Sequence, residues 1–267
     1  PDPLHPEIVF GAGRTEVSRY DRITGEVQNV TPVPAHEKGI RGDRTEPILF
    51  SPVDPHLLYY AANRLFRTTD YGHTWEAISP DLSREKTGQP ESVPPLAADQ
   101  AAKRRGAIYS VAASYKNTQT IWAGTDDGLV WITRDGGAHW SNITPPGVSS
   151  WSKVAQIDAS RFDDNSSYVA INRMRVDDMR PYAFRTHDGG KTWQSIANGL
   201  PEDAPVNAVR ADPERPGLLF AATEKNVMVS FDDGDHWREL DYNLPHTSMR
   251  DLLVHGDDLI VATHGRS

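Results

Sequence analysis

One eight-residue pattern recurs four times in this chain and constrains its fold more than any other feature. Each copy reads Ser/Thr-x-Asp-x-Gly-x-Thr/His-Trp, and the aspartates follow one another at intervals of 44 to 65 residues. The copies are TTDYGHTW (68–75), TRDGGAHW (133–140), THDGGKTW (186–193) and SFDDGDHW (230–237). Self-similarity at such a period predicts a propeller, a solenoid or another array of one repeated supersecondary unit.

Each copy lies within a unit of four expected strands, which we name A to D in chain order. Strand A precedes a turn such as Asp54-Pro55 or Asp212-Pro213, a residue pair that favours turns. Strand C ends in the repeated pattern, and strand D begins at its tryptophan. The expected strands A to D cover 48–51, 57–61, 65–68 and 75–78 in the first complete unit, 108–113, 120–124, 130–133 and 140–143 in the second, 154–159, 167–171, 182–186 and 193–196 in the third, and 206–211, 218–222, 227–230 and 237–240 in the fourth.

Four antiparallel strands repeated radially form a β-propeller, so we predict an all-β fold and one propeller segment over residues 1–267. The one expected helix covers 96–105, within a long surface insertion at 83–106. The expected complete blades cover about 46–82, 106–145, 152–201 and 205–245, and the expected partial blades cover 1–34 and 249–267.

The two partial blades differ in the strands that they supply. Residues 8–12, 17–20 and 26–30 are expected to form strands B to D, whereas 251–254 and 259–262 are expected to form strands A and B. We therefore expect a segment of a larger propeller of about six to ten blades. Further blades or partner chains are expected to cover its open ends, because an open arc leaves sheet edges exposed.

The composition excludes several classes of function. The formal net charge of −9 argues against a nucleic-acid partner, whose phosphates require clustered lysine and arginine. The chain has no cysteine, and therefore no disulfide, thiolate metal site or thiol nucleophile. No run of 18 apolar residues occurs, so membrane insertion is not expected.

The repeated pattern itself predicts a tight turn between strands C and D. Its aspartate can accept backbone N–H groups, its glycine permits a positive φ, and its tryptophan buries a large ring. A calcium ion takes six to eight oxygen ligands, more than one pattern supplies, so neither a metal nor another cofactor is expected. The residues given this structural role are Asp70, Gly72, Trp75, Asp135, Gly137, Trp140, Asp188, Gly190, Trp193, Asp232, Gly234 and Trp237.

The pattern resembles the Asp-box, or BNR repeat, of sialidases, sortilin-type receptors, xyloglucan-degrading endoglucanases and photosystem II assembly factors. Together with the DPxxP turn at 212–216, it resembles large bacterial proteins described as sortilin-like or glycosyl hydrolase-like. The resemblance covers nearly the whole chain and implies a propeller in the periplasm or outside the cell. It does not select an activity, because these families share the repeat and differ in function.

A ligand site is expected on the face formed by the B–C loops and the D-to-A connections, opposite the Asp-boxes. A glycosidase needs two carboxylates about 5–10 Å apart, and no motif selects a pair among the available ones. The candidate catalytic carboxylates are Asp126, Asp127, Asp177, Asp178 and Glu224. The candidate ligand-binding residues on the same face are Arg64, Trp151, Arg173, Arg175, Arg180, His264 and Arg266.

Three hypotheses follow from these residues. The leading one is a sortilin-like scaffold that binds a protein or a glycan through its charged loops and Trp151, without catalysis. The second is a glycoside hydrolase with some catalytic residues outside this segment. A sialidase would clamp a carboxylate with three arginines, and Arg14 also lies on this rim, but the sialidase nucleophile and N-terminal arginine motif are absent. The third is an assembly factor of a membrane complex.

Overall fold

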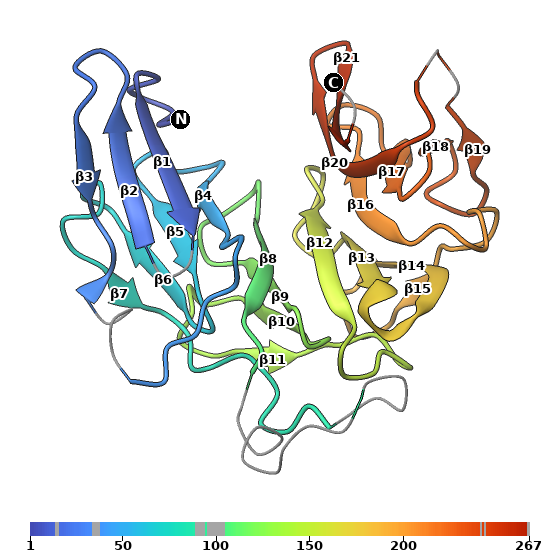
Figure 1. Cartoon of the computed structure of the whole chain (residues 1–267), viewed down its shortest axis with the longest axis horizontal. Helices are drawn as coiled ribbons and strands as arrows, with labels where there is room; N and C mark the ends of the chain where they lie inside the picture. Colours follow the sequence, from blue (N-terminus) through green and yellow to red (C-terminus); the bar gives the residue numbers. More distant parts are fainter. Residues whose placement is uncertain are drawn as a thin grey trace.

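The computed structural model describes residues 1–13, 16–33, 38–88, 94, 105–240, 242 and 244–265. Its strands form six separate antiparallel sheets that follow one another along the chain (Figure 1). The prediction of an all-β fold built from four-stranded antiparallel sheets is confirmed. The helix expected at 96–105 lies outside the described residues, apart from Arg105.

Four sheets have four strands, and the sheets at the two ends have three and two. Each strand pairs with the next along the chain, so every sheet is a meander. The strands, sheet by sheet, are β1 (Ile8–Gly13), β2 (Glu16–Asp21) and β3 (Val27–Asn29); β4 (Ile48–Phe50), β5 (Leu58–Ala61), β6 (Leu65–Thr68) and β7 (Glu76–Ala77); β8 (Ile108–Ala113), β9 (Ile121–Thr125), β10 (Val130–Thr133) and β11 (Ser141–Asn142); β12 (Lys153–Ala159), β13 (Ser167–Arg173), β14 (Asp178–Thr186) and β15 (Gln194–Ser195); β16 (Val206–Ala211), β17 (Leu219–Thr223), β18 (Val227–Ser230) and β19 (Arg238–Glu239); β20 (Ser248–His255) and β21 (Asp258–His264).

The strand boundaries differ from the expected ones in three places. The outer strands β7, β11, β15 and β19 have two residues each and begin after the tryptophan, because the tryptophan belongs to the turn. The expected loop at 173–180 is largely a hairpin, since β13 ends at Arg173, β14 begins at Asp178 and a 3-10 turn (Met174–Val176) joins them. The strands β20 and β21 are also longer than expected.

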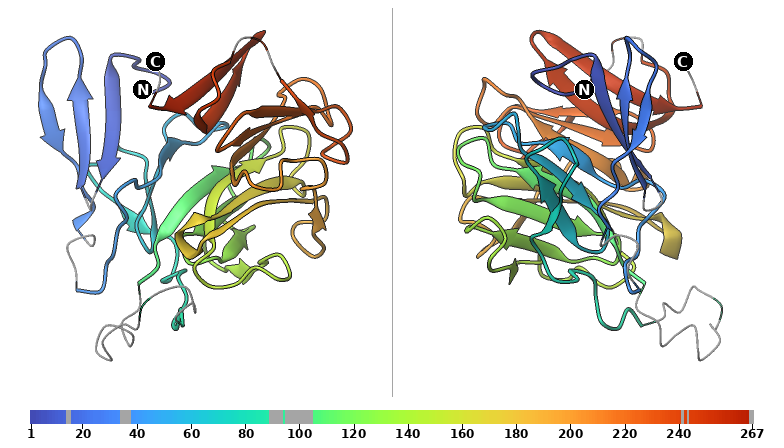
Figure 2. Two further views of the ribbon diagram at one scale, coloured as in Figure 1. Left: turned by 45° about the vertical axis from the view of Figure 1, so that its right-hand side comes forward. Right: turned by 90° about the vertical axis from the view of Figure 1, so that its left-hand side faces the viewer.

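The sheets are arranged as an arc, with β1–β3 at one end and β20–β21 at the other (Figures 1 and 2). A layer of apolar side chains separates each sheet from the next. The layer between the first two four-stranded sheets contains Tyr59, Leu65 and Ile121, all almost fully buried. The next layer contains Trp122 and Ile157. Every four-stranded sheet is therefore buried on both faces, which explains why runs such as LYYA in β5 are apolar throughout.

A repeated hydrogen bond connects each Asp-box to the sheet before it. The tryptophan Nε1–H donates to a backbone carbonyl just beyond the outer strand of the preceding sheet, at 2.6–2.8 Å. The donor and acceptor pairs are Trp75 with Val30, Trp140 with Ile78, Trp193 with Ile143, and Trp237 with Ile196. The Asp-box therefore fixes how one sheet is placed against the next.

The turn backbone of each Asp-box packs against the same acceptor residue. A Cβ on Gly137 would meet the backbone carbonyl of Ile78 well inside van der Waals contact, and Gly137 has φ +104°. A Cβ on Gly72, Gly190 or Gly234 would lie 2.6–2.9 Å from side-chain atoms of Val30, Ile143 and Ile196, respectively. Only glycine satisfies both the backbone conformation and the close approach.

Within each turn, the aspartate is the common acceptor. Asp188 Oδ1 accepts the Thr192 N–H at 2.9 Å, and Asp188 Oδ2 accepts the Thr192 hydroxyl at 2.6 Å. The Thr186 hydroxyl donates to the same carboxylate at 2.9 Å. His139 and His236 take the place of the threonine in two copies and contact Asp135 and Asp232 through Nδ1 at 2.6 Å.

The Asp-box turns and the B–C loops lie at opposite ends of the strands. Three C–D turns each donate one backbone hydrogen bond to an A–B turn, and three B–C loops each donate one to a D-to-A connection. The first group is Gly136 to Gln119, Gly189 to Asn165 and Asp233 to Gly217. The second group is Asn63 to Arg41, Asp126 to Ala107 and Glu224 to Pro205.

Replacing Gly137 with alanine is expected to lower the free energy of unfolding by about 3 kcal/mol, because backbone strain adds to a clash with the backbone of Ile78. Gly147 also has a positive φ but has open space around its Cβ position, so Gly147→Ala should cost only about 1 kcal/mol. Urea unfolding followed by tryptophan fluorescence measures both. Equal losses would contradict the role of close sheet approach.

Replacing Asp188 with asparagine tests the turn electrostatics. The Thr192 hydroxyl and N–H, followed by the Thr186 hydroxyl, lower the pKa of Asp188 from 3.8 to about 2. A carboxyl with a lowered folded-state pKa stabilises the fold above its unfolded pKa and loses that contribution as the pH falls toward the folded pKa. The Asp188→Asn variant should therefore be less stable than the unmodified protein at neutral pH, and the difference should narrow between about pH 4 and pH 2.

Urea unfolding at a series of pH values measures this difference. Asp177→Asn is the matched control, because the Asp177 carboxylate accepts no hydrogen bond from the described residues. The control should follow the unmodified protein across the series. A constant difference between Asp188→Asn and the unmodified protein would rule out the assigned role of the carboxylate charge.

Candidate functional site

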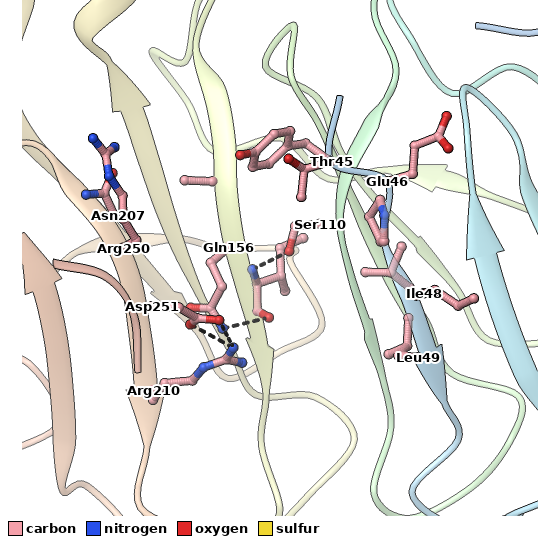
Figure 3. Close-up of a pocket in the computed structure, with 15 residues that line it drawn as sticks. Thr45, Glu46, Ile48, Leu49, Ser110, Gln156, Asn207, Arg210, Arg250 and Asp251 are labelled. Carbon is pink, nitrogen blue, oxygen red and sulfur yellow. Dashed lines mark hydrogen bonds and ion pairs between the residues drawn. The ribbon is translucent and has the colours of Figure 1, made fainter. Parts of the chain in front are cut away.

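A groove runs along the concave side of the arc, where the innermost strands of five sheets meet. Its volume is about 400 Å³, and its lining comes from β4, β8, β12, β16 and β20, together with residues 45–47 before β4. Figure 3 shows side chains from these strands directed into the shared space. We call this cavity the inner groove.

A bulge at one equivalent position in four inner strands directs side chains into the inner groove. The antiparallel register shifts between Ile108 and Ser110 in β8, and shifts in the same way in β12, β16 and β20. The extra residues are Tyr109, Ala155, Asn207 and Arg250, and all four line the groove. A bulge leaves one residue outside the ladder and redirects its side chain, so the groove surface is set by backbone geometry.

Side chains next to the bulges connect one inner strand to the next. The Ile157 N–H donates to Ser110 Oγ at 2.7 Å, and the Val209 N–H donates to Gln156 Oε1 at 2.9 Å. These hydrogen bonds take up the backbone donors that the radial arrangement leaves without a strand partner. The groove therefore carries polar groups that are held in place, beside apolar lining residues such as Ile48, Leu49 and Val111.

An ion-pair network crosses three sheets at the groove. Arg210 on β16 contacts Asp251 on β20 at 3.0 Å (Figure 3). It also contacts Asp158 on β12 at 3.2 Å, and its Nε donates to the Leu252 carbonyl at 2.9 Å. Burial raises the pKa of Asp158, opposed by the Arg210 charge and the Ala211 N–H. Desolvation of Arg210 is outweighed by the two aspartates, so its pKa is raised.

A chain of amide hydrogen bonds positions Arg250. Asn172 Nδ2 donates to Asn207 Oδ1 at 2.8 Å, and Asn207 Nδ2 donates to Glu224 Oε1 at 2.9 Å. Arg250 then contacts the same Glu224 oxygen at 2.9 Å. Since Asn172 and Asn207 are buried, this chain gives the guanidinium of Arg250 a defined position at the groove.

A second cavity of about 470 Å³ lies beside the groove, where B–C loops and D-to-A connections meet. We call it the groove mouth. Tyr109, Asp126, Lys153, Arg175 and Arg250 are among its lining residues, and Tyr109 and Arg250 also line the inner groove. The ammonium of Lys153 lies 4.5 Å from the centroid of the Tyr109 ring and 3.5 Å from its hydroxyl.

The five candidate catalytic carboxylates do not form one cluster of unpaired acids. Asp126 lines the groove mouth, but it contacts Arg175 at 3.2 Å and accepts the Ala107 N–H at 2.9 Å. Asp127 is buried behind it and bonded to the Thr125 hydroxyl and the Arg84 N–H; burial raises its pKa, opposed by those two donors.

The other three candidates are placed differently. Arg180 holds Asp178 in a two-pronged ion pair at 2.8–2.9 Å and, with Tyr182, lowers the pKa of Asp178 below its ordinary range. Asp177 is exposed in a left-handed turn position, with φ 58°. Glu224 is held by Asn207 and Arg250.

Among the candidate binding residues, Arg175 lies at the groove mouth, where its guanidinium also donates to the Asp126 carbonyl at 2.6 Å. Arg173 and Arg180 instead pair with Asp178 and stack near Tyr182. Trp151 has φ 67°, and its Nε1–H donates to the Gly88 carbonyl at 3.1 Å, at the base of the long insertion.

The last three candidate positions give less information about a ligand. Arg64 lies in the turn between β5 and β6, and its buried Nε has no hydrogen-bond partner among the described residues. His264 ends β21 and is exposed. Arg266 and Arg14 lie outside the described residues.

A serine–histidine–aspartate chain also occurs, on the Asp-box face. Ser166 Oγ lies 2.8 Å from His187 Nδ1, and His187 Nε2 lies 2.7 Å from Asp233 Oδ2. Asp233 also contacts Arg185 and the Tyr168 hydroxyl, so its carboxylate is shared by three partners from the neighbouring sheet. We assign this series of hydrogen bonds to the packing of one sheet against the next.

Sequence reasoning missed Glu46, Tyr109, Lys153, Asn207 and Arg250, all of which line the groove or its mouth. The sequence candidates came from loops, whereas Tyr109, Asn207 and Arg250 are bulge residues of inner strands. Lys153 begins β12, and Glu46 precedes β4. Among the described residues, no group of three or more His, Asp or Glu has a geometry that holds a metal, and no helix is long and apolar enough to cross a membrane.

No protein-family model matches the chain. A xyloglucanase from a Paenibacillus species is 24% identical over 277 residues, which cover 90% of this chain and 26% of that enzyme. The crystal structure of a GH74 xyloglucanase from Xanthomonas campestris superposes with a TM-score of 0.68 and 17% identity, over 98% of this chain and 43% of that one. YCF48 from Cyanidioschyzon merolae gives a TM-score of 0.59 and 14% identity, over 92% of this chain and 73% of that one.

The fold is therefore that of the Asp-box β-propellers, with similarity in sequence and structure to xyloglucanase propellers and in structure to YCF48. The chain spans about a quarter of the length of the Paenibacillus enzyme that it matches. The structural likenesses, at under 25% identity, are likenesses of fold.

Replacing Arg210 with methionine is expected to lower the free energy of unfolding by about 3 kcal/mol, because Asp158 loses its cationic partner in a buried position. Arg215 contacts Asp212 at 3.5 Å with its side chain 74% exposed, so Arg215→Met should change stability by less than about 1 kcal/mol. Chemical unfolding measures both. A double variant with Asp158→Asn should recover most of the Arg210→Met loss; no recovery would contradict the pairing.

Proposed function

We propose that this chain forms part of the glycan-binding groove of a glycoside hydrolase-type propeller that acts on xyloglucan or a related β-glucan. The observation that carries the proposal is the inner groove, which crosses five sheets and receives Tyr109, Asn207 and Arg250 from three of its four bulges. A polysaccharide presents hydroxyl groups along its length, and a groove with polar side chains and a tyrosine ring suits hydrogen bonding and stacking to such a chain.

The similarity to xyloglucanases supports this hydrolase hypothesis over the sortilin-like scaffold that the sequence favoured. Hydrolysis of a glycosidic bond requires one carboxyl as acid and a second as base or nucleophile. Asp126, Asp178 and Glu224 are each held by an arginine, and Asp127 is buried behind the mouth. We therefore assign binding to this groove, and assign the acid and the base to carboxylates other than these four.

Calorimetric titration of the purified chain with xyloglucan oligosaccharides tests the proposal. Tyr109→Ala should weaken binding about tenfold, because the stacking surface in the groove is lost. Tyr109→Phe keeps the ring and should retain most of the affinity. Tyr20→Ala removes a tyrosine that is 41% exposed on the first sheet, away from the groove, and should bind as the unmodified chain does.

Two results would reject the proposed function. One is that the unmodified chain binds none of these oligosaccharides. The other is that Tyr20→Ala loses as much affinity as Tyr109→Ala, since the effect would then have no connection with the groove.

A further inference from the structure

The groove mouth has an excess of positive charge in a protein whose formal net charge is −9. Four cationic side chains line it, and two carboxylates accompany them. The cations are Arg44, Lys153, Arg175 and Arg250, and the carboxylates are Asp43 and Asp126. Because the rest of the protein repels anions, this local excess does not arise from the overall composition.

Two of the four cations are already paired. Arg175 donates to both the carboxylate and the backbone carbonyl of Asp126. Arg250 contacts Glu224 at 2.9 Å, and the buried amide chain through Asn207 fixes that carboxylate. Their charges are thus largely balanced within the protein.

The other two cations have no carboxylate partner among the described residues. Lys153 carries three N–H donors, and its one acceptor there is the Tyr109 hydroxyl at 3.5 Å. Arg44 is exposed at the start of the segment that leads into β4, and its guanidinium makes no hydrogen bond to the described residues.

The two carboxylates at the mouth do not cancel these charges. Asp126 accepts hydrogen bonds from the Ala107 N–H and from Arg175, so both of its oxygens are occupied. Asp43 accepts the N–H of Arg44 at 2.6 Å and makes no ion pair with the described residues. One unpaired carboxylate thus faces two unpaired cations.

Lys153 is held where a ligand that occupies the groove would meet it. Its Cα lies in register with buried Asn172, and its ammonium packs over Tyr109, which lines both the groove and the mouth. A sugar that stacks on Tyr109 would therefore place its substituents near the Lys153 ammonium. An ammonium packed against a ring has lost part of its hydration, which strengthens its contact with an anion.

We propose that the groove mouth is a subsite for a carboxylate carried by the glycan, as in a chain with glucuronic acid units, and that Lys153 is its main contact with Arg44 in support. This inference rests on the proposed glycan-binding function and narrows it to acidic glycans. Lys153 positions the acidic unit and sets specificity, while the inner groove binds the neutral part of the chain.

The test compares a glucan oligosaccharide that carries one glucuronic acid with the same oligosaccharide after reduction of its carboxyl group to an alcohol. Calorimetric titration of the unmodified chain should show about tenfold tighter binding of the acidic form, and added salt should reduce that ratio. In Lys153→Met the ratio should fall to about twofold while the affinity for the neutral form stays unchanged. Lys191→Met, on the opposite Asp-box face, is the control and should keep the full ratio.

The outcomes separate this inference from the proposed function. Equal binding of the two oligosaccharides by the unmodified chain would overturn the acidic subsite and leave the glycan groove standing. An unchanged ratio in Lys153→Met would overturn the assignment to Lys153. Binding of neither oligosaccharide would reject the proposed function itself. Inorganic phosphate is the remaining probe: displacement of the acidic oligosaccharide by phosphate at equal concentration would overturn the glycan assignment in favour of a general anion site.

Discussion

The arrangement of the whole chain depends on the hydrogen bond from each Asp-box tryptophan to the carbonyl of the preceding sheet. A glycine in the same turn lets the backbone approach that sheet within contact distance. Since donor, acceptor and glycine recur in four copies, neighbouring sheets are placed in nearly the same way each time. The arc and its concave groove are consequences of this repeated placement.

The two ends of the strands thus have different roles, one in the packing of sheets and the other in lining the groove. At one end, the Asp-box carboxylates are saturated by hydrogen bonds from their own turns, which holds their pKa values at about 2 and leaves them poorly suited to exchanging protons near neutral pH. At the other end, bulged inner strands present Tyr109, Asn207 and Arg250 to a shared cavity. Packing and ligand contact are therefore served by separate groups of residues.

Much of the fold was predictable, because the apolar runs form strands and the Asp-box residues form turns through interactions between residues close in the sequence. The boundaries that differed, around Arg173–Asp178 and in β20–β21, are places where strand pairing extends into charged sequence that lacks an alternating apolar pattern. The site was less predictable. Asp126 and Arg175 were both identified from loop positions, but that they neutralise each other depends on the packing of two sheets. The groove residues in the inner strands were missed, since a bulge leaves no strong sequence signal.

The sequence by itself determined the class of fold, the approximate position of each sheet and the face on which the Asp-boxes lie, because these follow from turn chemistry and from the spacing of one repeated pattern. Only the tertiary structure decided which polar side chains share a cavity and which charges are already paired. The reason is physical. Lys153 and Tyr109 are 44 residues apart in the sequence, and Arg210 and Asp158 are 52 residues apart, so their contacts depend on how whole sheets pack.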